Sequence, residues 1–446
     1  YLDVNIFNLL ISKKQMIEKA KRFNPDLIAF SFVTNQFEDM KNMGTLLKKE
    51  LNVPIVVGGT HPTILPEIVI KENWVDYLCI GEGEQAIVEL ADKIERGEDV
   101  INIRNLWIKS NGSLIKNPVR PLIQDLDSIP LPDFELFEQY GVFYKRIDVI
   151  TGRGCMNACS FCINSFKQSF YKGQKYLRRR SVGNVMKELI YLDEKYNPKQ
   201  YRFLDDTFAY DIDRLKEFRK EYVKFINKPY RCTLSPNVTT EDIVIELGKS
   251  NCDIVEMGFQ TASYKLRSKM MFRYYTNDKV LEINKWLKNN NIRLAIDLIF
   301  GTPGETPEDM WETLYFCDKL DIKYTTPSYM YPFPKTKILD IARQMDYIDD
   351  VDYERVVQGE GAYHTTFLLK HPHKAEVHKF QALISIYNKA PNWEKPALRK
   401  VLKWKYSWVH KFFHFLSVPF NDWYEFRRRV FMIPKMIIKT KRTLKS

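Results

Sequence analysis

The chain has 446 residues, of which 45% are hydrophobic and 14% aromatic, and its formal net charge is +12. This length exceeds what one hydrophobic core organises and predicts two or three domains, while the apolar content excludes a wholly disordered chain. Seven scattered cysteines exclude a disulfide-dense secreted scaffold and favour a reducing cytoplasm. The charge is uneven, because residues 395–446 hold 14 Lys and Arg against only Asp422 and Glu425 and so carry the whole excess.

Residues 1–99 alternate short apolar runs with helical patterns. The sequence opens directly on the strand-like YLDVNIF, so we expect the true beginning of the protein to lie upstream. The runs DLIAFSF, PIVVGG and VDYLCIG lack polar alternation, which is typical of buried parallel strands in a doubly wound α/β domain. Ligands of such sheets bind beyond the carboxyl ends of the strands. The residues at those ends are Ser31, Gly58, Gly59, Thr60, His61, Gly81, Glu82 and Gly83.

Residues 100–147 have the composition of a linker. The Asn-Gly pair in IKSNGSLIKN predicts a β-hairpin, and DSIPLPDFELF is interrupted by prolines. In residues 148–345 about six strand-like runs alternate with helical segments, which predicts a partial (β/α)6 barrel similar to a TIM barrel. Chemistry in such a barrel takes place at the carboxyl ends of the strands.

Three cysteines follow the first of these strands, in the segment GRGCMNACSFC at residues 152–162. A zinc site would need a fourth ligand, and the closest downstream cysteine is Cys232. A disulfide would leave one thiol over and is not expected in the cytosol. A 4Fe–4S cluster normally takes four thiolates, so a cluster held by Cys155, Cys159 and Cys162 would leave one iron open for a small molecule. Zinc binding or a purely structural role are the alternatives.

The segment CMNACSFC fits the pattern CxxxCxΦC, with Phe161 as the aromatic residue before the last cysteine. In this it resembles the radical S-adenosylmethionine (SAM) superfamily, and the preceding GRG is similar to the subfamily with an N-terminal cobalamin-binding domain. The resemblance covers about three quarters of the chain. It implies that Cys155, Cys159 and Cys162 ligate three irons of a 4Fe–4S cluster, while the amino and carboxylate groups of SAM chelate the fourth iron.

Three later segments also resemble motifs of this superfamily. FLDDTF looks like its second-strand motif and implies that Asp205 and Asp206 lie at the mouth of the barrel in contact with SAM, although such a pair could equally cap the next helix. VEMGFQTAS resembles its E-x-G-x-E-S pattern with Gln260 in place of the usual Glu, which can hydrogen-bond SAM but supplies no charge. DLIFGTPGET is similar to its stretch near the adenine, which implies SAM contacts at Gly301 and Pro303.

The N-terminal runs together resemble a flavodoxin-like (Rossmann-like) cobalamin-binding domain. The resemblance implies that cobalamin is bound by Ser31, Gly58, Gly59, Thr60, Gly81, Glu82 and Gly83. The family's histidine-donating Asp-x-His-x-x-Gly loop belongs where this sequence has no residues, so the lower ligand of cobalt stays unassigned. His61 is expected to be a hydrogen-bonding surface residue rather than a cobalt ligand. The alternative is a degenerate module that keeps the fold without the cofactor.

Residues 346–446 form a predicted helical, basic and aromatic region. The amphipathic pattern starting at KPALRKVL is too short to span a bilayer; it could lie at a membrane interface or pack on the barrel with its basic face in solvent. Nucleic acid is not an expected partner, because no recognition motif is present. The histidines expected at the surface in this region are His364, His371, His373 and His378.

The resemblance therefore implies an α/β enzyme that uses a 4Fe–4S cluster and cobalamin to cleave SAM reductively and to functionalise an unactivated carbon, most plausibly by methyl transfer. The alternatives are a cobalamin-dependent radical cyclisation, rearrangement or oxidation, and a non-enzymatic iron–sulfur or cobalamin sensor. The expected partners are a small-molecule, lipid or peptide substrate and an electron donor such as flavodoxin or ferredoxin. We expect a cytoplasmic, anaerobic protein, with peripheral contact at the inner face of the membrane through residues 346–446 as a further possibility.

Overall fold

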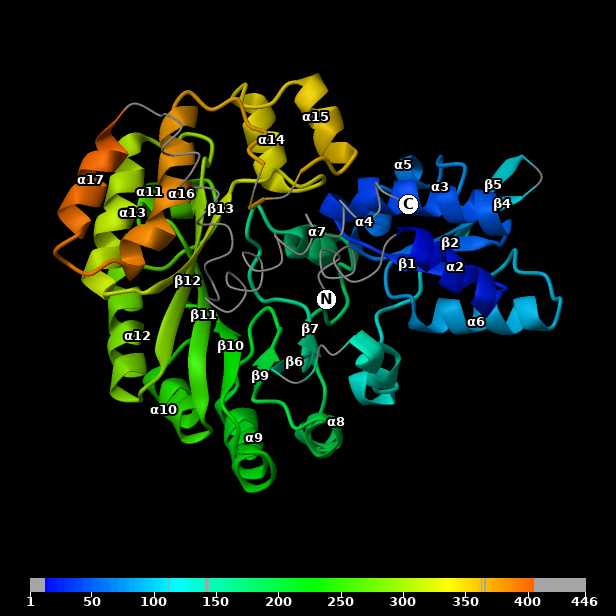
Figure 1. The fold of residues 1–446 in the computed structure, drawn as a ribbon, viewed down its shortest axis with the longest axis horizontal. Coiled ribbons are helices and arrows are strands. Elements are labelled where there is room, and N and C mark those ends of the chain that lie inside the picture. Colours follow the sequence, from blue (N-terminus) through cyan, green and yellow to red (C-terminus); the bar gives the residue numbers. More distant parts are fainter. Residues whose placement is uncertain are drawn as a thin grey trace, which may run out of the picture.

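The computed structural model describes residues 13–404 except for residues 111, 141, 142, 144, 362 and 365. The predicted strand YLDVNIF and most of the basic C-terminal segment, from residue 405 onward, lie outside the described residues. The described chain forms two α/β units that lie side by side, a smaller N-terminal one drawn in blue and cyan and a larger one drawn in green to orange (Figure 1).

The N-terminal unit is built on a five-stranded sheet in the order β1-β2-β3-β4-β5. Its first three strands are parallel and short, as predicted: β1 (Ile28–Ser31), β2 (Ile55–Gly58) and β3 (Tyr77–Cys79). The described helices of this unit are α2 (Lys13–Phe23), α3 (Phe37–Leu51), α4 (Thr60–Ile64), α5 (Pro66–Val69) and α6 (Glu84–Glu95), with the 3-10 turn η1 (Thr34–Gln36). The predicted parallel α/β arrangement is confirmed for this part of the chain, whereas the strand-order reversal of a doubly wound sheet is not present among its described strands.

The predicted hairpin exists, but it is not part of a free linker. Its strands, β4 (Leu106–Ser110) and β5 (Ser113–Lys116), extend the first sheet, because β4 pairs antiparallel with β3. The true connection between the units follows the hairpin and contains the 3-10 turns η2 (Leu126–Ser128) and η3 (Phe134–Tyr140).

The second unit is a six-stranded, wholly parallel sheet in the order β13-β12-β11-β10-β9-β6, which confirms the predicted partial barrel. Its strands are β6 (Arg146–Val149), β9 (Gln200–Phe203), β10 (Tyr230–Leu234), β11 (Cys252–Gln260), β12 (Arg293–Phe300) and β13 (Tyr324–Tyr329). The helices that cover its outer side are α8 (Val182–Tyr196), α9 (Ile212–Phe225), α10 (Glu241–Lys249), α12 (Asn277–Asn289) and α13 (Pro307–Leu320), and the short α11 (Tyr264–Lys269) follows β11.

Each of these five covering helices begins after a residue that caps it. A side-chain oxygen of the capping residue accepts a hydrogen bond from a backbone N–H of the first turn, which satisfies a donor that has no partner within the helix. The caps are Ser181, Asp211, Thr240, Thr276 and Thr306. Such a cap contributes about 1 kcal/mol to stability, so the helix starts are written into the sequence itself.

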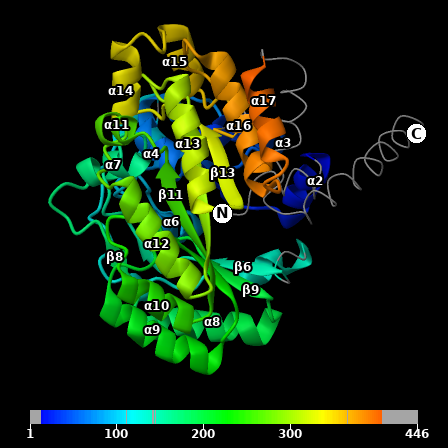
Figure 2. The same cartoon turned by 90° about the vertical axis from the view of Figure 1, so that its left-hand side faces the viewer.

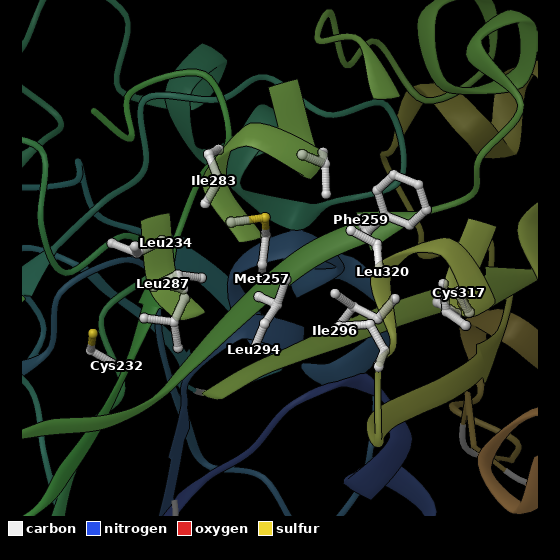
Figure 3. Close-up of a cluster of buried hydrophobic side chains, with 14 of the residues drawn as sticks. Cys232, Leu234, Met257, Phe259, Ile283, Leu287, Leu294, Ile296, Cys317 and Leu320 are labelled. Atoms are coloured by element: carbon white, nitrogen blue, oxygen red, sulfur yellow. The ribbon is translucent and has the colours of Figure 1, made fainter. Parts of the chain in front are cut away.

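The main hydrophobic core lies between the outer face of this sheet and its helices (Figure 3). Alternate residues of the central strands point toward helices α12 and α13, as strand geometry requires. The labelled members of this core are Cys232, Leu234, Met257, Phe259, Ile283, Leu287, Leu294, Ile296, Cys317 and Leu320. The residues between them on each strand therefore face the inside of the barrel.

The described C-terminal helices are α14 (Lys337–Gln344), α15 (Asp350–Val357), α16 (Lys374–Lys389) and α17 (Lys395–Lys403). Helices α16 and α17 stand beside α13 and β13 and close that edge of the barrel (Figure 2). On α17, Lys395 and Arg399 each lie 2.7 Å from a carboxylate oxygen of Asp318, and Leu402 is buried. Residues 395–403 thus pack on the barrel, which was one of the two predicted alternatives.

The surface placement predicted for the histidines is wrong for His371, which is buried. It folds back against Tyr347 and Phe367, and its Nε2 lies 3.3 Å from the carbonyl oxygen of Thr302, while His364, His373 and His378 are partly buried. None of the helices in the described part of the chain combines the length and apolar character needed to cross a membrane.

Candidate functional site

A cavity of about 2300 Å³ lies between the two units and continues into the barrel. It is larger than the roughly 300–1,000 Å³ of a pocket for one small ligand, so it has room for more than one bound molecule. All seven residues predicted to bind cobalamin line it: Ser31, Gly58, Gly59, Thr60, Gly81, Glu82 and Gly83. The barrel side contributes Phe161, Cys162, Asp206 and Gln260. The carboxyl ends of both sheets therefore open onto one shared space.

The loop that carries the three cysteines is fastened to three separate elements. The side-chain amide of Gln168, on α7 (Ile163–Phe170), donates a hydrogen bond to the carbonyl oxygen of Cys155 at 2.7 Å. The backbone N–H of Ser160 donates to the carbonyl oxygen of Met271, just after α11, at 3.1 Å. The carbonyl oxygen of Ser160 in turn accepts from the N–H of Ile338, on α14, at 3.0 Å. The loop conformation is thus fixed by the surrounding barrel.

The thiols of this loop have donors close to them. Arg273 donates through Nη1 to Sγ of Cys159 at 3.6 Å, and the backbone N–H of Asn157 donates to Sγ of Cys155 at 3.4 Å. Donors that point at sulfur stabilise a thiolate. Burial raises the pKa of Cys162 to about 12, so this thiol keeps its proton at neutral pH until a metal ion displaces it.

The arrangement does not suit a single metal ion. In the part of the chain that the structure describes, no three His, Cys, Asp or Glu side chains are placed so that they could hold one ion. The thiolates of an iron–sulfur cubane each bind a different iron, so they need a wider separation than the ligands of one zinc ion. Three cysteines without a fourth protein ligand are the donor set expected of a 4Fe–4S cluster with one open iron.

The structure gives a physical reason for the residues of the GRG segment, in addition to their resemblance to the family motif. Gly152 and Arg153 form the short strand β7 (Gly152–Arg153), which pairs antiparallel with β8 (Arg178–Arg179). Gly154 then adopts a φ of +92°, and a Cβ atom there would lie 2.4 Å from the carbonyl oxygen of Tyr176. Only glycine combines this backbone angle with this close approach, and the turn leads the chain directly to Cys155.

Glu82 joins the two units through a partly buried ionic network. Its Oε1 lies 2.8 Å from Nη1 of Arg153 and 2.9 Å from Nη2 of Arg178, and its Oε2 accepts the backbone N–H of Ile123 at 2.8 Å. Arg153 also pairs with Glu84 at 2.5 Å. Burial raises the pKa of Glu82, but the hydrogen bonds from Arg178 and Arg153 outweigh this effect and hold the pKa below its usual value. The carboxylate is therefore committed to protein partners, and its contact with cobalamin stays a prediction.

The adjacent acids Asp205 and Asp206 have different surroundings. Asp205 is buried, where it accepts hydrogen bonds from the N–H and the hydroxyl of Thr151 and forms an ion pair with Arg179 at 3.0 Å. It is not among the described residues that line the cavity. The alternative that this pair caps the next helix is wrong, because Asp211 caps α9.

Asp206 faces the cavity. Burial raises its pKa, although a hydrogen bond from Asn164 and the charge of Lys167 act in the opposite direction. Asp206 is thus the member of the pair that a ligand in the cavity can reach.

Gln260 ends β11 with a φ of +73°, next to a shift in strand register. Its side chain lines the cavity, and its buried Oε1 has no hydrogen-bond partner within the described structure. A buried acceptor without a donor is costly, so this oxygen fits a ligand that brings an N–H group, such as the amino group of SAM. Gly301 and Pro303 are buried and are not among the described residues that line the cavity. Their predicted contact with SAM remains a prediction.

On the wall formed by the N-terminal unit, the glycines have no side chains to cover the backbone. Gly59 has a φ of +96°, and a Cβ there would lie 2.7 Å from the backbone nitrogen of Phe32. The chain can therefore turn sharply at the end of β2 and present main-chain atoms to the cavity. This is the kind of wall that lets a flat, bulky ligand approach the strand ends closely.

The surface position predicted for His61 is wrong, because this side chain is fully buried. Helix α4 starts directly after β2 and carries the ring beneath the sheet edge, 4.6 Å from the ring of Phe37, with Nδ1 3.3 Å from the hydroxyl of Thr34. Burial lowers the pKa of His61 to about 4, so the ring is neutral at physiological pH. It is not among the described residues that line the cavity.

Sequence reasoning missed two kinds of cavity residue. Lys167 and Tyr171 follow the cysteine motif on and just after α7, and Lys167 reaches the hydroxyl of Thr60 in the other unit at 3.3 Å. The sequence did contain a signal for these two residues, because the cysteine motif leads directly into α7 and they lie on this helix or just after it. The charged residues inside the barrel were missed as well: Arg146, Arg202, Arg231, Glu256 and Asp297.

Comparison with known proteins agrees with the division of the chain into an N-terminal unit and a barrel unit. Residues 149–317 match the radical SAM superfamily, and residues 1–91 match the B12 binding domain. Over 331 residues the chain is 30% identical to an uncharacterized methyltransferase, PH0819, of Pyrococcus horikoshii, covering 72% of this chain and 70% of that protein.

Two further proteins are similar at lower identity. The anaerobic magnesium-protoporphyrin IX monomethyl ester cyclase of Rubrivivax gelatinosus is 26% identical over 70% of this chain, which spans 58% of the length of the cyclase. Among solved structures, the radical SAM methyltransferase TsrM from Kitasatospora setae, with cobalamin and a [4Fe-4S] cluster bound, superposes with a TM-score of 0.63 at 19% identity. That match covers 77% of this chain and 68% of TsrM, and it concerns the fold.

Proposed function

Because this chain belongs to the radical SAM superfamily and carries a B12-binding domain, we propose that it is an enzyme that transfers a methyl group from SAM to an unactivated carbon. One observation carries the proposal. All seven residues predicted for cobalamin come from one unit, and four of those predicted for SAM and the cluster, Phe161, Cys162, Asp206 and Gln260, come from the other, yet these two sets line one cavity. A substrate in that cavity is within reach of both cofactor positions.

The chain's own residues fit this division of labour. Cys155, Cys159 and Cys162 would hold the 4Fe–4S cluster, Gln260 and Asp206 would bind SAM beside it, and residues 58–60 and 81–83 would bind cobalamin on the opposite wall. When bound, these cofactors supply the reductive cleavage of SAM and the transfer of its methyl group. The protein contributes their orientation and the exclusion of water from the space between them.

Several side chains have defined roles in holding that geometry. The Glu82 network ties the cobalamin wall to the strand that precedes the cysteine loop. Lys167 bridges the same two units through its contact with Thr60. Gln260 presents a neutral acceptor, which can hold an ammonium group of a ligand without adding negative charge. These contacts set the distance between the two cofactor walls.

The proposal is tested with anaerobically reconstituted protein, SAM, dithionite and the small-molecule fraction of an anoxic cell extract as the source of substrate. A methyl donation leaves S-adenosylhomocysteine, and reductive cleavage leaves 5′-deoxyadenosine, so chromatography of the SAM-derived products separates the candidates. We expect both products, with the labelled methyl group of SAM in a new compound. Formation of 5′-deoxyadenosine alone would favour cyclisation, rearrangement or oxidation, the chemistry suggested by the similarity to the cyclase. The absence of both products would favour a non-enzymatic sensor.

The partners and the location are also proposals. We propose a reducing, anaerobic cytoplasm and an electron donor such as flavodoxin or ferredoxin, because the seven cysteines are all free of disulfides and a cluster of this kind needs an external electron. The substrate is a small molecule, a lipid or a peptide, and nucleic acid is not proposed. Peripheral contact with the inner face of the membrane is assigned to the basic segment after residue 404, and flotation of the protein with anionic vesicles tests it.

A further inference from the structure

The inner face of the half-barrel is charged. The side chains that alternate with the apolar core of Figure 3 are Arg202 on β9, Arg231 on β10, Glu256 on β11 and Asp297 on β12, and Arg146 starts β6. All five line the cavity, below the rim where the cysteine loop and Gln260 lie. A charged lumen within a protein core costs desolvation energy, so it calls for an explanation by its partners.

Most of these charges are paired. Arg146 lies 2.9 Å from Asp148, and Arg202 lies 2.7 Å from Glu256, so the guanidinium of Arg202 crosses over β10 to reach β11. Asp297 forms no ion pair with a described residue, and among the three arginines the exception is Arg231, whose guanidinium pairs with no carboxylate in the described part of the chain.

Arg231 is in an unfavourable environment. Its Nε is buried without a hydrogen-bond partner in the described structure, as is Nε of Arg202, its register neighbour on β9. Burial lowers the pKa of Arg231, and the like charges of Arg146 and Arg202 lower it further, against the attraction of Glu256 and Asp253. A permanent cation held beside two others, with an unused donor, is the arrangement that proteins use to bind carboxylate or phosphate.

The lumen is also polarised. The arginines lie on β6, β9 and β10, while the carboxylates that face the cavity on β11 and β12 are Glu256 and Asp297. Burial, together with the charge of Glu256, raises the pKa of Asp297 to about 6. An anion in the lumen is therefore drawn toward Arg231 and away from β12.

We propose that the lumen of the half-barrel is a substrate subsite in which Arg231, supported by Arg202 and Arg146, binds an anionic carboxylate or phosphate group of the substrate. The inference rests on the proposed function, because it takes the cavity as the place where substrate meets the cofactors. It adds the substrate class, an anionic molecule that enters the barrel with its charged end first.

The position of the subsite also sets the reach of the substrate. Arg231 is in register with Ile254 on β11, and Gln260 ends that strand six residues later. At about 3.3 Å per residue, the two levels are roughly 20 Å apart along the strand, less the several ångströms that a long arginine side chain spans. The substrate is therefore elongated, with the carbon to be modified well separated from its anionic group.

Binding of simple anions tests the subsite without turnover. Isothermal titration calorimetry of the anaerobically reconstituted holoenzyme would compare hexanoate, hexyl phosphate and, as the charge control, hexylammonium. We expect at least one of the two anions to bind and hexylammonium not to bind, and the preference between the anions tells a carboxylate from a phosphate subsite. Arg231→Gln should weaken the binding by about 10- to 100-fold, the loss of one or more charge-assisted hydrogen bonds.

The matched control is Arg219→Gln, which removes an arginine on α9 that pairs with Glu246 and is not among the described cavity residues. It should leave anion binding unchanged, and Arg231→Lys, which keeps the charge, should fall between wild type and Arg231→Gln. Iron and cobalt contents measured in parallel report whether each variant folds and takes up its cofactors. The proposal is overturned if neither anion binds, if hexylammonium binds as well as the anions, or if Arg231→Gln or Arg231→Lys binds them like the wild type. None of these results would contradict the proposed methyl transfer, because the experiment measures binding alone.

Discussion

Gly154 and Gly173 both adopt left-handed backbone angles, with φ of +92° and +86°, but their surroundings differ. Gly154, directly before Cys155, has the carbonyl oxygen of Tyr176 where a side chain would begin, whereas Gly173 has no described atom within 4 Å of that position. The pair separates the cost of the backbone angle from the cost of the close approach.

We predict that Gly173→Ala costs about 1–2 kcal/mol of stability, from backbone strain alone. Gly154→Ala should cost more and should also lower the iron content, because the cysteine loop must shift to admit the methyl group. Urea unfolding and iron analysis of both variants check this. Equal iron contents and equal losses of stability would show that the close approach at Gly154 does not matter.

Arg273 places a positive charge beside one of the thiols. Its Nη1 donates to Sγ of Cys159, and the guanidinium is buried, 5.3 Å from the ring of Tyr275. A positive charge beside a cluster ligand favours the reduced cluster.

Arg273→Met should therefore make the midpoint potential of the cluster more negative, by roughly 60 mV for the loss of one charge-assisted hydrogen bond. A redox titration followed by electron paramagnetic resonance measures the shift, with the exposed Arg293→Gln as control. An unchanged potential at unchanged iron content would mean that Arg273 only packs in the barrel.

Among the secondary-structure elements, β7 and β8 of the second unit are held against the N-terminal unit by the network that they form with Glu82. Arg178 has a side-chain exposure of 3%, so removal of the carboxylate leaves a buried charge without its partner. We predict that Glu82→Gln costs about 3–5 kcal/mol, measured by urea unfolding at pH 7. The control is Glu98→Gln, whose 4.0 Å contact with Arg96 is exposed; a loss no larger than in this control would contradict the assigned role.

The same network predicts a pH dependence. The pKa of Glu82 is lower in the folded protein than in the unfolded chain, so the unfolded state binds the proton more readily. Its contribution is therefore fully present above the unfolded pKa, near 4.5, and is lost as the pH falls through the folded value. The difference in stability between wild type and Glu82→Gln should shrink below pH 4.5 in urea unfolding. A constant difference down to pH 3 would show that the carboxylate does not titrate with folding.

The elements themselves were largely predictable, because their signals are local. The six barrel strands, the three parallel N-terminal strands and the helix caps such as Ser181 and Thr306 are all present in the sequence. The partners of individual side chains were not, since they come from distant segments. Glu82 is 71 residues from Arg153, and the ring of His61 is buried by Phe37 on another helix. Such tertiary contacts also explain why His371 was wrongly predicted to lie at the surface. They explain as well why the hairpin was assigned to a linker, because no local sequence pattern predicts that β4 pairs with β3.

In the whole molecule, the two units together enclose a single cavity. Residues at the carboxyl ends of strands in both sheets line the same cavity, so the predicted cofactor-facing residues of each unit become its walls. The charged lumen beneath it was not predictable from motifs, because its arginines come from three separate strands and meet only when the half-barrel forms. The cavity thus has a place for the cofactors at its rim and, by our proposal, a place for the substrate's charge at its base.

The proposed chemistry requires three thiolates that leave one iron of a 4Fe–4S cluster for SAM, and this requirement can be measured directly. Electron paramagnetic resonance would be recorded on the anaerobically reconstituted, dithionite-reduced protein with and without SAM, alongside iron and sulfide analysis. We predict about four irons per chain, a cluster signal that changes when SAM is added, and loss of the cluster in Cys162→Ala but not in the buried-cysteine control Cys317→Ala. A signal that SAM leaves unaltered, or zinc in place of iron, would show that these thiolates do not hold a cluster with an iron open to SAM.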